Sequence, residues 1–148
     1  MGALTSLLRN AEAAGVYWFD RPSAPERKEV EVKAARQGLA FFPVAGQGVR
    51  SKEQFLDRFA RALDFPDYFG GNWDAFEECL TDLSWRDAPG YVILYEDFDT
   101  FAAHAPDQFE VALEILNAAV EFWRDQGKPM FVFLAGEGGS EWGLKSPL

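Results

Sequence analysis

The sequence predicts a single α/β domain in which helices cover a small parallel sheet. Short apolar runs that are typical of strands alternate along the 148 residues with longer segments of helical periodicity. The strand-like runs are apolar at nearly every position rather than at every second one, a pattern typical of parallel strands buried on both faces. Hydrophobic residues make up 48% of the chain, which is enough for a substantial core and argues against disorder.

The chain contains four strand-like runs and six segments that are expected to be helical. The strand-like runs are GVYWF (15–19), LAFFPV (39–44), YVILY (91–95) and MFVFLA (130–135). The helices are expected at about 3–13, 24–37, 52–63, 73–83, 97–104 and 106–126. Segment 24–37 is ambiguous, because residues 29–32 alternate as in a strand, but the glycine at 38 favours a helix. We expect Ser51 to cap the third helix in a capping box with Glu53, and residues 136–148 to be loosely held.

The charge balance indicates what kind of partner the chain can have. With 24 acidic and 14 basic residues, the formal net charge is −10. Such a charge argues against direct binding of nucleic acid, which depends on lysine and arginine, and favours a basic protein as partner. No stretch reaches the ~18 apolar residues needed to span a bilayer, so no membrane contact is expected. A single cysteine, Cys79, excludes an intramolecular disulfide and favours the reducing cytoplasm.

The residues that usually carry catalysis are scarce. His104, the one histidine, has no nucleophile beside it in sequence, and a Cys/His zinc site cannot be assembled. Glu77 and Glu78 precede Cys79 and should raise the pKa of its thiol, so we expect a buried packing cysteine. The glycine-containing stretches 46–48 and 136–139 match no phosphate-binding loop. No catalytic residue, metal site or cofactor is expected, although a carboxylate-based enzyme or metal-binding protein stays open as an alternative.

The segment YFGGNWDAFEECL (68–80) combines a glycine turn with an acidic helix. Asp74, Glu78 and Asp82 recur every four residues and would form one stripe, with Glu77 beside it. No lysine or arginine within the helix relieves their repulsion. Aromatic residues at 68, 69 and 73 adjoin these acids, and aromatic anchors dominate many binding interfaces. The combination predicts a protein-binding surface.

The longer segment FPDYFGGNWDAFEECLTDLSW strongly resembles the signature of the barstar family, intracellular protein inhibitors of barnase-type ribonucleases. The matching residues are Pro66, Tyr68, Phe69, Gly70, Asn72, Trp73, Asp74, Ala75, Phe76, Cys79 and Leu80. A weaker similarity covers residues 39–135, which leaves 1–38 as an N-terminal extension packed on the domain and 136–148 as a C-terminal tail. The resemblance implies a sheet of three parallel strands, to which GVYWF could add a fourth.

The resemblance also implies a mode of action, in which this helix and the preceding loop enter the ribonuclease active site and exclude RNA. Asp74 would meet the basic cleft, and Glu78 stands at the position of an aspartate that mimics a substrate phosphate. The expected partner-binding residues are Tyr68, Phe69, Gly70, Gly71, Asn72, Trp73, Asp74, Glu77, Glu78 and Asp82.

Three positions depart from the family pattern. Glu78 is one methylene longer than aspartate, Glu77 replaces a tryptophan, and Phe122 aligns near an acid of the last long helix. The expected partner is a basic ribonuclease or nuclease toxin, bound by a monomer in a 1:1 complex. A non-nuclease protein partner is the alternative.

Overall fold

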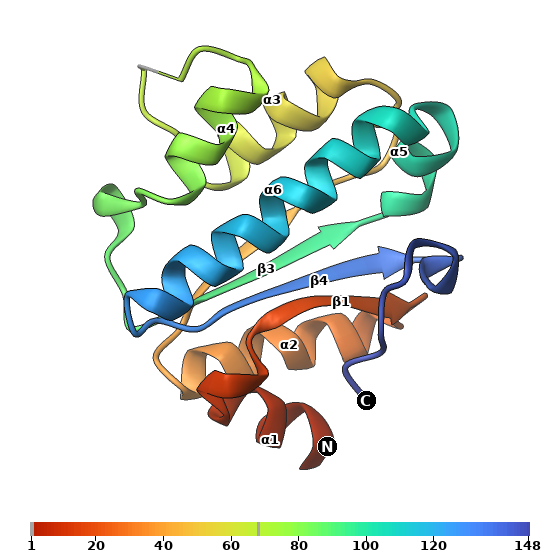
Figure 1. Cartoon of the computed structure of the whole chain (residues 1–148). Helices are drawn as coiled ribbons and strands as arrows, with labels where there is room; N and C mark the ends of the chain where they lie inside the picture. The colour runs from red at the N-terminus through yellow and green to blue at the C-terminus, as the bar shows by residue number, and fades with distance from the viewer. Residues whose placement is uncertain (1, 68) are drawn as a thin grey trace.

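The computed structural model describes residues 2–67 and 69–148, and within them one parallel sheet forms the centre of the molecule (Figure 1). Its strands are β1 (Gly15–Asp20), β2 (Ala40–Val44), β3 (Tyr91–Glu96) and β4 (Met130–Gly136), in the order β1-β4-β3-β2. The predicted α/β class is confirmed. The described sheet has four strands: the three that the resemblance implied and, as the fourth, GVYWF, which forms β1 and pairs with β4 along its whole length, from Gly15 opposite Phe131 to Asp20 opposite Gly136.

Helices cover both faces of the sheet (Figure 1). They are α1 (Gly2–Arg9), α2 (Ala24–Arg36), α3 (Lys52–Ala62), α4 (Trp73–Leu80), α5 (Phe98–His104) and α6 (Pro106–Asp125). Three 3-10 turns, η1 (Ala11–Ala13), η2 (Ser84–Arg86) and η3 (Gly139–Trp142), complete the described elements. α2 and α1 lie on one face, while α3, α4, α5 and α6 lie on the other. None of the helices seen in the described residues is long and apolar enough to cross a membrane.

The central strands have the burial expected of a parallel sheet. All seven residues of β4 and the first five of β3 are buried. β2, in contrast, is an edge strand with Pro43 exposed. The backbone N–H of Ala40 donates to Gly90 O on the β3 side, so by alternation position 43 faces outward. A proline is tolerated there because no ladder hydrogen bond needs its missing N–H.

Local capping decided the helix boundaries. The ambiguous segment is helical, as favoured, because Ser23 and Glu26 form a capping box at the start of α2. Ser51 caps α3 as predicted, but the capping box with Glu53 is wrong, because Ser51 Oγ accepts from Gln54 N and Gln54 is therefore the third helical residue. The first helix ends at Arg9 rather than at 13, since Asn10 caps the separate turn η1.

The C-terminal tail is packed, and the expectation of a loosely held tail is wrong. Trp142 packs edge-on against Phe109 of α6, with 4.7 Å between ring centroids. The backbone N–H of Trp18 in β1 donates to Lys145 O at 2.8 Å. The tail therefore extends the hydrogen bonding of β1 at the free edge of the sheet and covers part of the core.

Candidate protein-binding surface

The segment before α4 is built as a turn that ends in a helix cap. Gly71 has φ +71°, a conformation that glycine adopts without strain, and open space surrounds it. Asn72 is extended, and its Oδ1 accepts a hydrogen bond from Ala75 N at 2.8 Å. Gly70, Gly71 and Asn72 are all exposed. The predicted contact residue Asn72 therefore also fixes where α4 begins.

The inner face of α4 attaches the helix firmly to the core. Phe76, Cys79 and Leu80 have no exposed surface. At the start of the helix, Trp73 Nε1 donates to Gln108 Oε1 of α6 at 2.9 Å. At its end, the buried Trp123 Nε1 of α6 donates to Leu80 O at 2.8 Å.

α4 is thus tied to α6 at both ends, and we call these two indole hydrogen bonds the tryptophan clamps. The sequence predicts that Trp123 lies in the core. It does not predict the hydrogen bond from Trp123 to Leu80, 43 residues away, or the one from Trp73 to Gln108. Both depend on long-range packing, which periodicity does not reveal.

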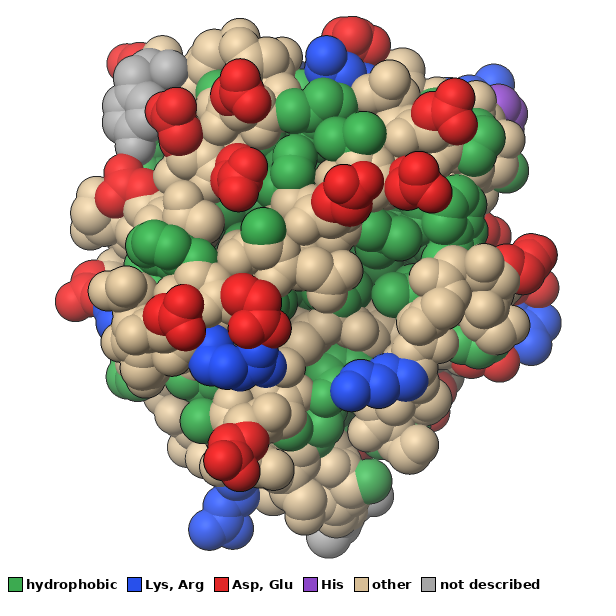
Figure 2. Space-filling view, viewed as in Figure 1, with side chains coloured by type: hydrophobic (Ala, Val, Ile, Leu, Met, Phe, Trp, Pro, Cys, Tyr) green, Lys and Arg blue, Asp and Glu red, His purple; other side chains and the backbone are tan. Residues whose placement is uncertain are grey.

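The outer face of α4 carries three exposed carboxylates, those of Asp74, Glu77 and Glu78. The helix contains no basic residue, and across the described residues none of these three acids takes part in an ion pair. Figure 2 shows acidic side chains gathered over α4 and along the neighbouring surface of α6. The predicted acidic surface therefore exists, and its carboxylates point to solvent.

Asp82, expected on the same helical stripe, lies outside the helix. α4 ends at Leu80, and Thr81 Oγ1 donates back to Glu77 O at 2.8 Å. Leu83 has φ +48°, a left-handed backbone conformation in which an α-helix cannot continue. Asp82 is exposed in this turn. The prediction that Asp74, Glu78 and Asp82 form one helical stripe is therefore wrong, because only Asp74 and Glu78 belong to α4.

The aromatic residues of the segment pack partly inward. Tyr68 lies outside the described residues. Phe69 and Trp73 are half-buried: Phe69 contacts Phe65 at 5.1 Å between ring centroids, and Trp73 contacts Phe55 and Phe76 at 5.8 Å each. These rings hold the turn and α4 against the core and leave only part of their surface for a partner.

The two groups considered for catalysis are a buried cysteine and an exposed histidine. Cys79 is buried, and burial, followed by the nearby charges of Asp82 and Glu78, raises the pKa of its thiol. This direction fits the predicted packing role. His104 is exposed at the end of α5, with Nδ1 2.9 Å from Thr100 O. Over residues 2–67 and 69–148, no three His, Cys, Asp or Glu side chains are grouped so that they could hold a metal ion.

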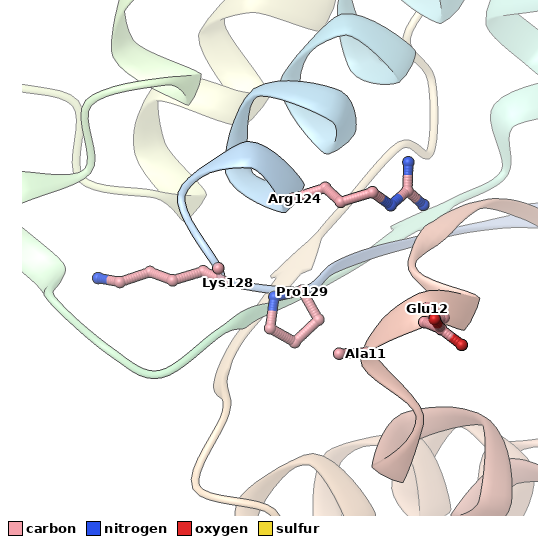
Figure 3. Close-up of a pocket in the computed structure, with 6 residues that line it drawn as sticks. Ala11, Glu12, Arg124, Lys128 and Pro129 are labelled. Atoms are coloured by element: carbon pink, nitrogen blue, oxygen red, sulfur yellow. The ribbon is translucent and has the colours of Figure 1, made fainter.

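A cavity of about 450 Å³ lies between η1 and the turn from α6 to β4 (Figure 3). Its basic residues are committed to other contacts. Arg124 pairs with Glu121 and donates to Ala14 O at 2.6 Å. Lys128 points away from Arg124 and pairs with Asp87 at 2.6 Å. The two cations therefore do not converge on a common ligand position.

Comparison with protein families identifies one match in the region that contains α4. The model of the family described as Barstar (barnase inhibitor) matches residues 39–135. A Bacillus subtilis (strain 168) protein named "Putative ribonuclease inhibitor YrdF" is 34% identical over 87 residues, which cover 57% of this chain and 90% of that protein. The family match contains β2, β3, all of β4 except Gly136, and both tryptophan clamps, whereas α1, α2 and β1 precede it.

Solved structures with a similar fold include parts of two larger proteins. The Aeropyrum pernix ORC2 protein, solved as ADPNP-ADP complexes, has a TM-score of 0.63 at 14% identity over 96% of this chain and 42% of that chain. Cdc6p from Pyrobaculum aerophilum has a TM-score of 0.64 at 18% identity over 99% of this chain and 40% of that chain. The chain spans about two fifths of these proteins, and at such identities the likeness shows the fold alone.

Proposed function

This chain belongs to the barstar family, and we propose that it is a protein inhibitor that closes the active site of a barnase-type ribonuclease with α4 and the preceding turn. The observation that carries the proposal is the outer face of α4. Asp74, Glu77 and Glu78 are exposed without basic partners among the described residues, on a helix fixed by the tryptophan clamps. A ribonuclease active site is cationic because it must hold phosphates.

The physical basis is substitution of carboxylates for phosphates. Arginine and lysine donate charge-assisted hydrogen bonds to either group, and these bonds are stronger than neutral ones. Because α4 is already fixed to α6, little conformational entropy is lost when Asp74 and Glu78 engage a partner. Opposite charges also accelerate encounter, which suits an inhibitor that must act before its target damages RNA.

We further propose that the chain acts as a monomer in a 1:1 complex in the cytoplasm, without catalytic activity of its own. The net charge of −10 supports a basic protein partner and disfavours direct contact with RNA phosphates. Residues 69–74, together with Glu77 and Glu78, would form the contact. Asp82 would lie at its margin, beyond the end of α4.

Inhibition of barnase and of further barnase-type ribonucleases by purified variants tests the proposal. Replacing Asp74 and Glu78 by alanine should weaken inhibition by about a hundredfold or more, because the partner's cations lose their acceptors. The matched control replaces Glu12 and Glu141 by alanine. Both are exposed and lie in the short turns η1 and η3, outside α4, so the same change in net charge should have little effect.

The opposing results are distinct. Absence of inhibition by the unaltered chain, or equal losses in both double variants, would contradict the proposed function. A tight complex with a protein that is not a nuclease would favour the alternative partner. Stoichiometric uptake of Mg²⁺, Mn²⁺ or Ca²⁺ in calorimetry would favour a carboxylate-based metal site instead.

A further inference from the structure

A basic side chain of α3 lies against the start of the acidic helix. The Nζ atom of Lys52 is 6.0 Å from the centre of the Trp73 ring, at the limit of a cation–π contact. Trp73 is the first residue of α4 and one of the predicted contact residues. Lys52 and Trp73 are both half-buried. Lys52 therefore borders the proposed contact region, whose carboxylates are those of Asp74, Glu77 and Glu78.

Packing between α3 and α4 fixes the position of Lys52. Phe55 of α3 contacts Trp73 and Phe76 of α4, at 5.8 and 5.5 Å between ring centroids. Phe59, one turn further along α3, contacts Phe76 at 5.2 Å. Figure 1 shows the two helices side by side. Phe55 and Phe59 are buried, and Lys52 lies three residues before Phe55, on the same side of the helix. The charge of Lys52 is therefore held at the edge of α4 by a packed helix.

Lys52 occupies an electrostatically unfavourable position. It is the first residue of α3, directly after the cap Ser51, where the positive end of the helix dipole repels a cation. Neither Lys52 nor the exposed Arg50, two residues earlier, forms an ion pair with an acid of the described residues. A residue that breaks a local rule without a local gain is typical of a functional site. The position of Lys52 therefore points to a group outside the chain.

We propose that Lys52 determines the specificity of the contact region, by pairing with an acidic side chain at the rim of the partner's cationic cleft. The proposal rests on the proposed function and adds a requirement on the partner. A surface with acids alone would attract any basic protein, because attraction over distance depends little on detailed geometry. With a cation at one margin and carboxylates on the helix beside it, only a partner with the complementary arrangement pairs every charge.

Local pairing and net charge predict opposite effects of reversing this charge. Lys52→Glu adds two negative units to the formal net charge of −10, and this alone should accelerate encounter with a basic enzyme. If Lys52 pairs with an acid of the partner, the same substitution places two like charges against each other and weakens the complex. A glutamate at the start of α3 also suits the helix dipole, so weaker binding could not be ascribed to unfolding.

Dissociation constants test the inference, measured with the ribonuclease that the unaltered chain binds most tightly among barnase and further barnase-type enzymes. Lys52→Glu should weaken the complex about tenfold. Lys52→Met keeps the aliphatic stem against Trp73 and removes only the charge, so it should weaken the complex about threefold. The matched control is Arg36→Glu, at an exposed position of α2 on the opposite face of the sheet. It makes the same change in net charge and should not weaken the complex.

Charge reversal on the ribonuclease identifies the acid that Lys52 meets. Each acidic residue around the active site of the enzyme is replaced by lysine in turn. One of these replacements should weaken binding of the unaltered chain and restore binding of Lys52→Glu, because the two opposite charges then face each other again. If no replacement restores binding, Lys52 has no acidic counterpart and the inference is overturned.

The outcomes separate this inference from the proposed function. If the Asp74→Ala and Glu78→Ala double variant binds weakly while Lys52→Glu binds as tightly as Arg36→Glu, the inference is overturned and the proposed function stands. If the unaltered chain binds none of these ribonucleases, the proposed function fails and the inference fails with it. Weaker binding of Lys52→Glu, together with unchanged or tighter binding of Arg36→Glu and rescue by one reversal on the enzyme, supports the inference.

Discussion

At the scale of single residues, the candidate site depends on Asn72 as much as on its acids. Asn72 Oδ1 satisfies the N–H of Ala75 and thereby fixes the first turn of α4. Asn72→Ala should lower the free energy of unfolding by about 1 kcal/mol, the usual cost of losing such a cap. Asn72→Asp keeps an acceptor and should stay close to the unaltered chain in chemical denaturation. Equal stability of Asn72→Ala and the unaltered chain would show that the cap is not needed.

Cys79 provides a residue-scale test of packing. Its thiol is buried, and both burial and the neighbouring charges of Asp82 and Glu78 raise its pKa. The reactive thiolate is therefore scarce at pH 8 in the folded chain. We expect an aromatic disulfide reagent to modify the folded protein far more slowly than the protein in denaturant. Comparable rates in the two states would contradict the burial of Cys79.

At the scale of elements, the tryptophan clamps hold α4 in position. Trp123→Phe removes a buried donor and leaves Leu80 O without it, so it should destabilise the fold by about 1–3 kcal/mol. Trp73→Phe removes a half-buried bond to Gln108 and should cost about 0.5–1.5 kcal/mol. Thermal and chemical denaturation of the two variants measure this order. A larger loss in Trp73→Phe than in Trp123→Phe would contradict it.

The elements also show what the sequence could predict. Apolar runs identified every described strand, because a residue buried on either face of a parallel sheet must be apolar. The start of α2 was predictable from Ser23 and Pro25, since caps are local. Asp82, in contrast, was assigned to the helix because its spacing continued the pattern, whereas the hydrogen bond from Thr81 to Glu77 ended the helix earlier.

Long-range contacts account for the other differences. The packed tail depends on Trp142 meeting Phe109 and on Lys145 meeting β1, and neither pairing has a local sequence signal. For the same reason the acids of the candidate site were found from sequence but the tryptophan clamps were not. The exposed acids of α4 could be predicted from composition and spacing. The hydrogen bonds from α6 that hold α4 in place could not.

At the scale of the whole molecule, residues outside the family match complete the sheet. β1 covers one edge of β4. The indole of Trp18 in β1 packs so closely on Gly139 of the tail that a Cβ atom at position 139 would lie only 2.0 Å from the indole ring. The N-terminal extension and the tail therefore support each other. A chain limited to residues 39–135 would expose the edge of β4, whose seven residues are all buried in the full chain.

This arrangement predicts the behaviour of a truncated chain. Residues 39–135 alone should unfold at markedly lower temperature than the full chain, or should associate through the exposed edge of β4. Circular dichroism during heating, together with sedimentation, measures both properties. A monomeric fragment that unfolds cooperatively within a few degrees of the full chain would show that β1 and the tail are dispensable.

Hydrogen–deuterium exchange of the full chain, with and without an equivalent of barnase, tests the central claim most directly. If α4 and the preceding turn close a ribonuclease active site, exchange should slow in residues 69–80. It should stay unchanged in α2, on the opposite face of the sheet. Protection confined to α2 or to the tail, or no protection at any position, would contradict the claim.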